Sequence, residues 1–129
     1  YRMNDKIPTQ GEWNVLSCLW ERAPMTAMEL AAALEEKVGW AKSTTLTTLR
    51  RMEEKGLVTA RTVGRARHYT PAVERQTAVR RETRSFLDKV YRGSVGLMVS
   101  SMVQDQALSR EEIDQLYEIL RQAEEGRKA

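Results

Sequence analysis

Cysteine and histidine are almost absent from this chain of 129 residues, which has one of each, Cys18 and His68. A single cysteine cannot form an internal disulfide or a thiolate cage, and it is typical of a reducing compartment. The chain also has no nucleophile elbow, phosphate-binding loop or metal-ligand spacing, and its seven glycines are scattered. These absences predict a protein that is not an enzyme and that holds no metal and no cofactor.

Long apolar runs are missing too. The longest unbroken run is Leu30 to Leu34, whereas a helix that spans a bilayer needs about 20 apolar residues. The opening segment Tyr1–Lys6 has no apolar stretch of the kind that a secretory signal carries. We therefore expect no membrane insertion and a cytoplasmic location.

Charge is unevenly distributed along the chain. There are 21 Lys and Arg residues against 18 Asp and Glu, a formal net charge of +3. Between residues 42 and 67, seven basic residues are accompanied by only two acidic ones, Glu53 and Glu54. Such a basic footprint is typical either of a surface for a polyanion or of a solvated face. The elements on which these cations lie decide between the two interpretations.

Local signals predict six helices. Three capping boxes, Thr9–Glu12, Thr26–Glu29 and Ser109–Glu112, each open a segment with apolar residues at helical spacing. Further helices are expected over about 42–55, 73–92 and 95–103, and Gly56 supplies the left-handed residue that ends the first of these. Ala23–Met25 is expected to be a short connector.

The periodicity changes after Gly56. Leu57–Thr62 and Ala66–Thr70 have the composition of strands and flank a turn at Gly64, which predicts a small hairpin. Two strands alone are marginally stable in water, so the hairpin must pack on the helices. The expected fold class is mainly α with a small β-hairpin: a winged helix-turn-helix domain over residues 1–73, followed by a helical dimerisation region over residues 74–129.

The second region shows no separate core in its sequence. A segment below roughly 60 residues buries too little surface to be comfortably stable alone, and the simplest partner is a second copy of the chain. The residues expected to mediate dimerisation are apolar positions of the last three helices, namely Phe86, Leu87, Val90, Tyr91, Met98, Met102, Ile113, Leu116, Tyr117 and Leu120.

The helix over 42–55 has an apolar and a polar side. At 100° per residue, Thr45, Leu46, Leu49 and Met52 face the expected core. The other side starts with small hydroxyls and ends with cations, as a helix in a DNA major groove requires. A merely solvated face would more often use Glu, Lys and Gln than threonine, a poor helix former. The residues of this helix expected to bind DNA are Lys42, Ser43, Thr44, Thr47, Thr48, Arg51 and Lys55.

The hairpin adds three cations beside this helix. Arg61, Arg65 and Arg67 are expected to lie against a phosphate backbone or an adjacent minor groove; alternatively, they protect an edge strand by charge. The main alternative function is a winged-helix protein-interaction module without sequence-specific DNA binding. That function would favour an apolar or mixed outward face on the helix.

Short segments in a fixed order run through nearly the whole chain. They include Thr9–Glu12, Leu19-Trp20, Trp40, Thr44, Thr47, Lys55–Leu57, Gly64-Arg65, Tyr69–Pro71, Tyr91–Ser94, Met98-Val99, Glu111–Ile113 and Leu116-Tyr117. The ordered set resembles the penicillinase-repressor family, the BlaI/MecI/CopY type of bacterial winged-helix transcriptional regulators.

The resemblance implies a homodimer that represses transcription by binding palindromic, double-stranded operator DNA. The 43–55 helix would read bases and the 61–69 hairpin would be the wing. Members that respond to β-lactams are cleaved through a membrane sensor-protease pathway, usually at an Asn-Phe bond. That position falls at Ser101 and Met102, so the sequence departs from the pattern. The copper-responsive branch has a cysteine-rich C-terminal hook, which is excluded because Cys18 lies in the other half.

Overall fold

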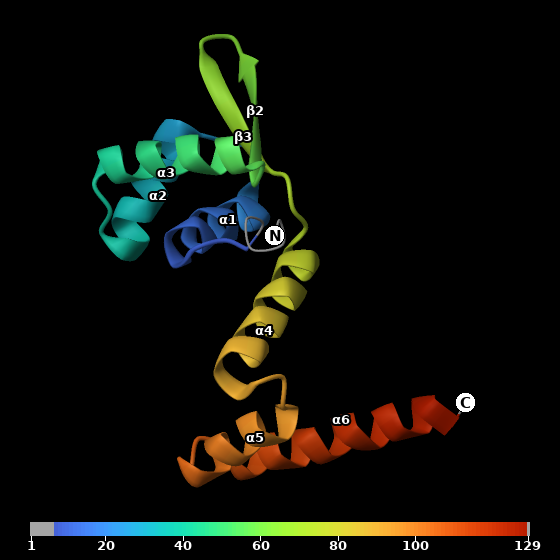
Figure 1. Cartoon of the computed structure of the whole chain (residues 1–129). Helices are drawn as coiled ribbons and strands as arrows, with labels where there is room; N and C mark the ends of the chain where they lie inside the picture. Colours follow the sequence, from blue (N-terminus) through green and yellow to red (C-terminus); the bar gives the residue numbers. More distant parts are fainter. Residues whose placement is uncertain (1–6, 129) are drawn as a thin grey trace. The chain divides into compact units, whose positions relative to one another are not determined.

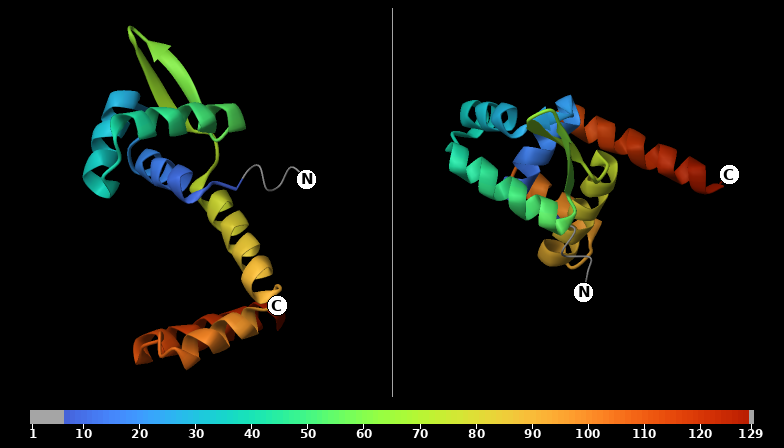
Figure 2. Two further views of the ribbon diagram at one scale, coloured as in Figure 1. Left: turned by 60° about the vertical axis from the view of Figure 1, so that its left-hand side comes forward. Right: turned by 90° about the horizontal axis from the view of Figure 1, so that it is seen from above.

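The computed structural model describes residues 7–128 (Figures 1 and 2). The segment Tyr1–Lys6, with its predicted lack of a secretory signal, lies outside the described residues. The elements are α1 (Gln10–Arg22), β1 (Met25–Thr26), α2 (Ala27–Val38), α3 (Lys42–Lys55), β2 (Val58–Val63), β3 (Ala66–Pro71), α4 (Arg75–Tyr91), α5 (Val95–Gln104) and α6 (Arg110–Lys128). The predicted class, mainly helical with a small β-hairpin, is confirmed.

The helices begin where local side-chain chemistry predicts. Before α1, the Thr9 amide donates to Glu12 Oε1 at 2.9 Å, and the Glu12 amide donates to Thr9 Oγ1 at 3.2 Å. The same reciprocal pairs join Thr26 to Glu29 and Ser109 to Glu112. All three predicted capping boxes are therefore confirmed, and each satisfies amides that a helix start leaves without partners.

The chain forms two compact units, one ending at Thr83 and the other beginning at Arg84. In the first unit, α1, α2 and α3 surround a single apolar core, on which the sheet also packs. Trp20 and Trp40 pack at its margin, and the Trp20 indole N–H donates to the Val73 carbonyl at 3.0 Å. The fully buried core side chains are Val15, Leu16, Leu19, Leu30, Leu34, Leu49, Met52, Leu57 and Val58.

The hairpin belongs to a three-stranded antiparallel sheet with the order β1-β3-β2. The strand β1 was not predicted: Met25, expected in a connector, pairs with Tyr69, and Thr26 pairs with His68. A strand of two residues is too short to show alternation, so only its distant partner reveals it. Pro71 is the last residue of β3, paired with Val58, one residue beyond the predicted strand end. Figure 1 shows the hairpin projecting from the helices.

The second unit has little core of its own. Among residues 84–127, Leu87 is the only residue that is buried. Tyr91, Met98, Ile113 and Leu116 are half-buried. Large apolar side chains on all three helices are exposed to solvent, namely Phe86, Val90, Val95, Leu97, Met102, Val103, Tyr117, Ile119 and Leu120. The division into domains after residue 73 and the dimerisation roles stay predictions.

One buried polar atom in the first unit predicts a stabilising substitution. Thr45 is completely buried on α3, and its hydroxyl has no hydrogen-bond partner in the part of the chain that the structure describes. Thr45→Val removes this hydroxyl while keeping the branched shape, so we expect the free energy of unfolding in urea to rise by about 1 kcal/mol. Thr47→Val, at an exposed site of the same helix, is the control and should leave it within about 0.5 kcal/mol. A loss of stability on Thr45→Val would contradict the cost assigned to the buried hydroxyl.

Candidate nucleic-acid interface

The outward side of α3 carries small hydroxyls and cations. Lys42, Ser43, Thr44, Thr47 and Arg51 are exposed. A shallow depression on this side is lined by Ser43, Thr44, Thr47, Thr48 and Arg51. The structure thus exposes five of the seven residues predicted for this helix, and four of these five line the depression.

Two residues of α3 differ in exposure from the prediction, although Thr48 still lines the edge of the depression. Leu46, expected in the core, is 42% exposed, whereas Thr48, expected to face outward, is 9% exposed and donates its hydroxyl to the Thr44 carbonyl at 2.7 Å. The reason is that α1 and α2 both pack on α3. They cover the side formed by Thr48, Met52, Thr45 and Leu49, which is rotated from the predicted one.

The start of α3 differs from that of the other capped helices. Its N-cap residue is Ala41, which has no side chain able to accept a hydrogen bond from the first turn. The first turn holds no acidic residue either. Its amides and the positive end of the helix dipole therefore meet no side-chain anion of their own.

Lys55, at the end of α3, is turned inward rather than outward as predicted. Its ammonium group donates to Glu12 Oε2 at 2.8 Å and to Glu12 Oε1 at 3.1 Å. The Glu12 side chain is 1% exposed, whereas that of Lys55 is 31% exposed. A buried carboxylate requires such a partner, because an unpaired charge in the interior is costly. Lys55 lies 43 positions along the chain from Glu12, so no local pattern in the sequence indicates this pair.

The hairpin presents two of its three predicted cations freely. Arg61 and Arg65 are exposed, and no ion pair within residues 7–128 involves them. Arg67 is exposed too, but it forms an ion pair with Glu53 of α3 and lies 5.8 Å from the centre of the Tyr69 ring. Arg67 therefore links the hairpin to α3.

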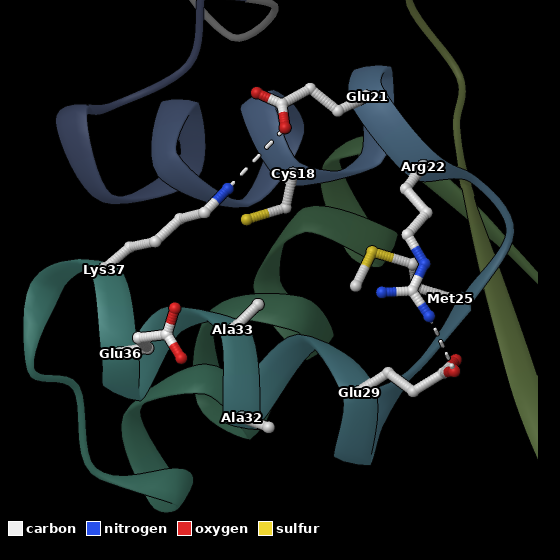
Figure 3. Close-up of a pocket in the computed structure, with 9 residues that line it drawn as sticks. All are labelled: Cys18, Glu21, Arg22, Met25, Glu29, Ala32, Ala33, Glu36 and Lys37. Carbon is white, nitrogen blue, oxygen red and sulfur yellow. Dashed lines mark ion pairs between the residues drawn. The ribbon is translucent and has the colours of Figure 1, made fainter.

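A separate pocket lies between α1 and α2 (Figure 3). Cys18 is buried at its base, and burial raises the pKa of the thiol above its ordinary value. Ion pairs join the two helices at its rim, from Lys37 to Glu21 at 3.7 Å and from Arg22 to Glu29 at 3.6 Å. A protonated thiol is a poor nucleophile and a poor metal ligand, so the structure gives Cys18 a packing role.

Other kinds of site find no support in the described residues. Within residues 7–128, no three His, Cys, Asp or Glu side chains are grouped so that they could hold a metal ion. The same part of the chain has no helix with the length and apolar character that crossing a bilayer requires. The hydroxyl-rich and basic surface of α3 and the hairpin is the candidate site.

Three helices followed by a hairpin that pairs with a short third strand define a winged helix-turn-helix domain. The model of the penicillinase repressor family matches residues 8–122, and the chain belongs to this family. It is 30% identical to the penicillinase repressor of Bacillus licheniformis over 95% of this chain and 98% of that protein. It is 25% identical to the methicillin resistance regulatory protein MecI of Staphylococcus aureus strain N315, over 87% of this chain and 91% of that protein.

A solved structure shows the same fold. The DNA-binding domain of the repressor BlaI matches 54% of this chain and 85% of its own length, with a TM-score of 0.51 and 24% identity. The predicted family and winged-helix fold are thereby confirmed. The named relatives are repressors and a regulatory protein, so the prediction that the chain is not an enzyme is confirmed as well.

The Glu12–Lys55 pair predicts a large effect on stability. Lys55→Met leaves the Glu12 carboxylate buried without its cation, and we expect the free energy of unfolding in urea to fall by about 1–3 kcal/mol. The double variant Glu12→Gln with Lys55→Met should recover most of the loss, because glutamine still completes the capping box. Arg110→Met breaks the exposed pair with Asp114 and should cost less than about 0.5 kcal/mol. Equal losses for Lys55→Met and Arg110→Met would refute the role assigned to the pair.

Proposed function

We propose that the chain is a homodimeric transcriptional repressor that binds palindromic operator DNA through α3 and the β2–β3 hairpin. The observation that carries the proposal is the outward side of α3, which combines small hydroxyls with exposed cations in a member of a repressor family. The name of the B. licheniformis relative, penicillinase repressor, and the description of the BlaI domain as DNA-binding support it.

In the proposed complex, α3 enters the major groove. Ser43, Thr44 and Thr47 are short enough to allow close approach to base edges, and threonine can contact the thymine methyl group. The amides of the first turn, which lack a side-chain cap, can donate to a phosphate. Arg51 is long enough to reach guanine or the backbone. Thr48 and Lys55 contribute by shaping and holding the helix.

The hairpin acts as the wing in this proposal. Arg61 and Arg65 meet the phosphate backbone or the neighbouring minor groove, while Arg67 keeps the hairpin attached to α3 through Glu53. Contacts of this kind add affinity without reading sequence, because phosphates are the same at every step. The wing therefore positions the domain, and α3 selects the site.

Dimerisation is proposed to occur through the second unit. The apolar side chains left exposed on α4, α5 and α6 include Phe86, Val90, Met102, Tyr117 and Leu120. Their exposure is costly in water, and a second copy would cover them. Leu87 is already buried, so little of its surface is left for a second copy.

Release from DNA is proposed to involve cleavage in the region of Ser101 and Met102 on α5. Met102 is exposed and Ser101 is half-buried. A membrane sensor-protease pathway of the kind implied by the family would act there. Because this residue pair departs from Asn-Phe, we assign cleavage to this region of α5 and not to one bond.

Two measurements test the proposed function. Light scattering should give twice the chain mass at micromolar concentration, and gel shift against competitor DNA should isolate a palindromic site. If about 6–10 phosphates are contacted per dimer, log affinity should fall with log salt with a slope of about −5 to −9. A monomer, or equal binding to matched and scrambled duplexes, would overturn the proposal and favour a protein-interaction module.

Two single variants separate positioning from base reading. Arg65→Ala should weaken binding about equally on all duplexes, because it removes a phosphate contact. Thr44→Ala should instead change the preference among operator variants by about 1–3 kcal/mol at the affected base pairs. Affinity on matched and scrambled duplexes measures both effects. If the two variants behave alike on both, the assigned roles are wrong.

A further inference from the structure

Leu46 is the one large apolar side chain that α3 exposes. Among the 14 residues of this helix, all of which the structure describes, the apolar residues Leu49 and Met52 are buried. Leu46 is 42% exposed. The exposed part of this side chain, on a surface of hydroxyls and charges, is open to a contact outside the chain.

The residues beside Leu46 on α3 restrict the kind of partner that can contact it. Lys42 and Arg50 lie four residues before and after it, so the three side chains form one stripe along the helix. Both cations are exposed, and no ion pair within residues 7–128 involves either of them. A purely apolar partner would leave these two charges without counterions. The stripe therefore fits a partner that is anionic at its edges and apolar at one point between them.

The major groove of DNA has this combination. Its edges are phosphates, and the only apolar group it presents on its floor is the C5-methyl group of thymine. Lys42 and Arg50 are separated by about 12 Å along the helix axis, so the two cations lie on either side of Leu46. Leu46 lies midway, in the half of the helix that meets base edges in helix-turn-helix proteins.

We infer that Leu46 selects thymine at one position of each half-site by covering its methyl group, while Lys42 and Arg50 bind the flanking phosphates. The inference rests on the proposed function and extends it by one readout residue. It divides the surface of α3 into two parts: the hydroxyl-lined depression of Ser43, Thr44 and Thr47, and the stripe of Lys42, Leu46 and Arg50.

Uracil replacement tests the inference, because deoxyuridine differs from thymidine only by the missing methyl group. The probe is a duplex selected from a random pool by the full-length chain, with its thymines replaced one symmetric pair at a time. The wild-type chain should lose about three- to tenfold in affinity at one pair where Leu46 contacts the methyl group. The Leu46→Ala chain should bind thymine and uracil equally at that pair, while keeping its sensitivity to uracil at any pair read by threonine.

The controls separate the possible causes of failure. Val38→Ala truncates a side chain of similar exposure, 44%, on α2, and it should respond to uracil as the wild type does. Leu46→Gln keeps length and helix propensity and should lose the thymine preference as Leu46→Ala does. If the wild type selects no duplex, the proposed function fails. The role of Leu46 is refuted, while the repressor function stands, in two cases. In the first, the wild type selects a duplex but its affinity does not change on uracil replacement. In the second, Leu46→Ala loses as much affinity as the wild type at every replaced pair.

Discussion

The buried carboxylate of Glu12 joins two distant parts of the winged-helix domain. One of its oxygens accepts from the Thr9 amide at the start of α1, and both accept from the Lys55 ammonium at the end of α3. A charge with 1% exposure is tolerated only when its partners are in place. Rotating or sliding α3 would break this pair, so the interaction helps to determine which residues of α3 face outward.

The same pairing divides the cations of the domain into two groups. Lys55 and Arg67 are bound to the carboxylates of Glu12 and Glu53 and hold α3 against α1 and the hairpin. Arg51, Arg61 and Arg65 are exposed. A count of basic residues between 42 and 67 cannot distinguish the groups, because the distinction depends on carboxylates supplied by the fold. The basic footprint that suggested a polyanion is therefore partly structural.

Features that depend on neighbours in the chain could be predicted, and features that depend on distant partners could not. The capping boxes and the left-handed Gly56, with φ of 81°, follow from local chemistry. The strand β1 escaped prediction because its partners are Tyr69 and His68. The predicted exposure of Leu46 and Thr48 was wrong, because helical periodicity shows which side of a helix is apolar but not which part of its surface the neighbouring helices cover. The apolar residues of α5 and α6 pointed to a missing partner without identifying it.

The sheet order has a mechanical consequence for the hairpin. Only His68 and Tyr69 of β3 have partners on both sides, from β1 and β2. Beyond them, residues 62–67 form a two-stranded arm; the Arg67–Glu53 ion pair links its base to α3, whereas its tip at residues 63–66 is weakly held on its own. The base of the hairpin is therefore held in a three-stranded sheet, whereas its tip is held by two strands only and deforms more easily. In the proposed complex, this end can follow variations in groove width while α3 keeps its register.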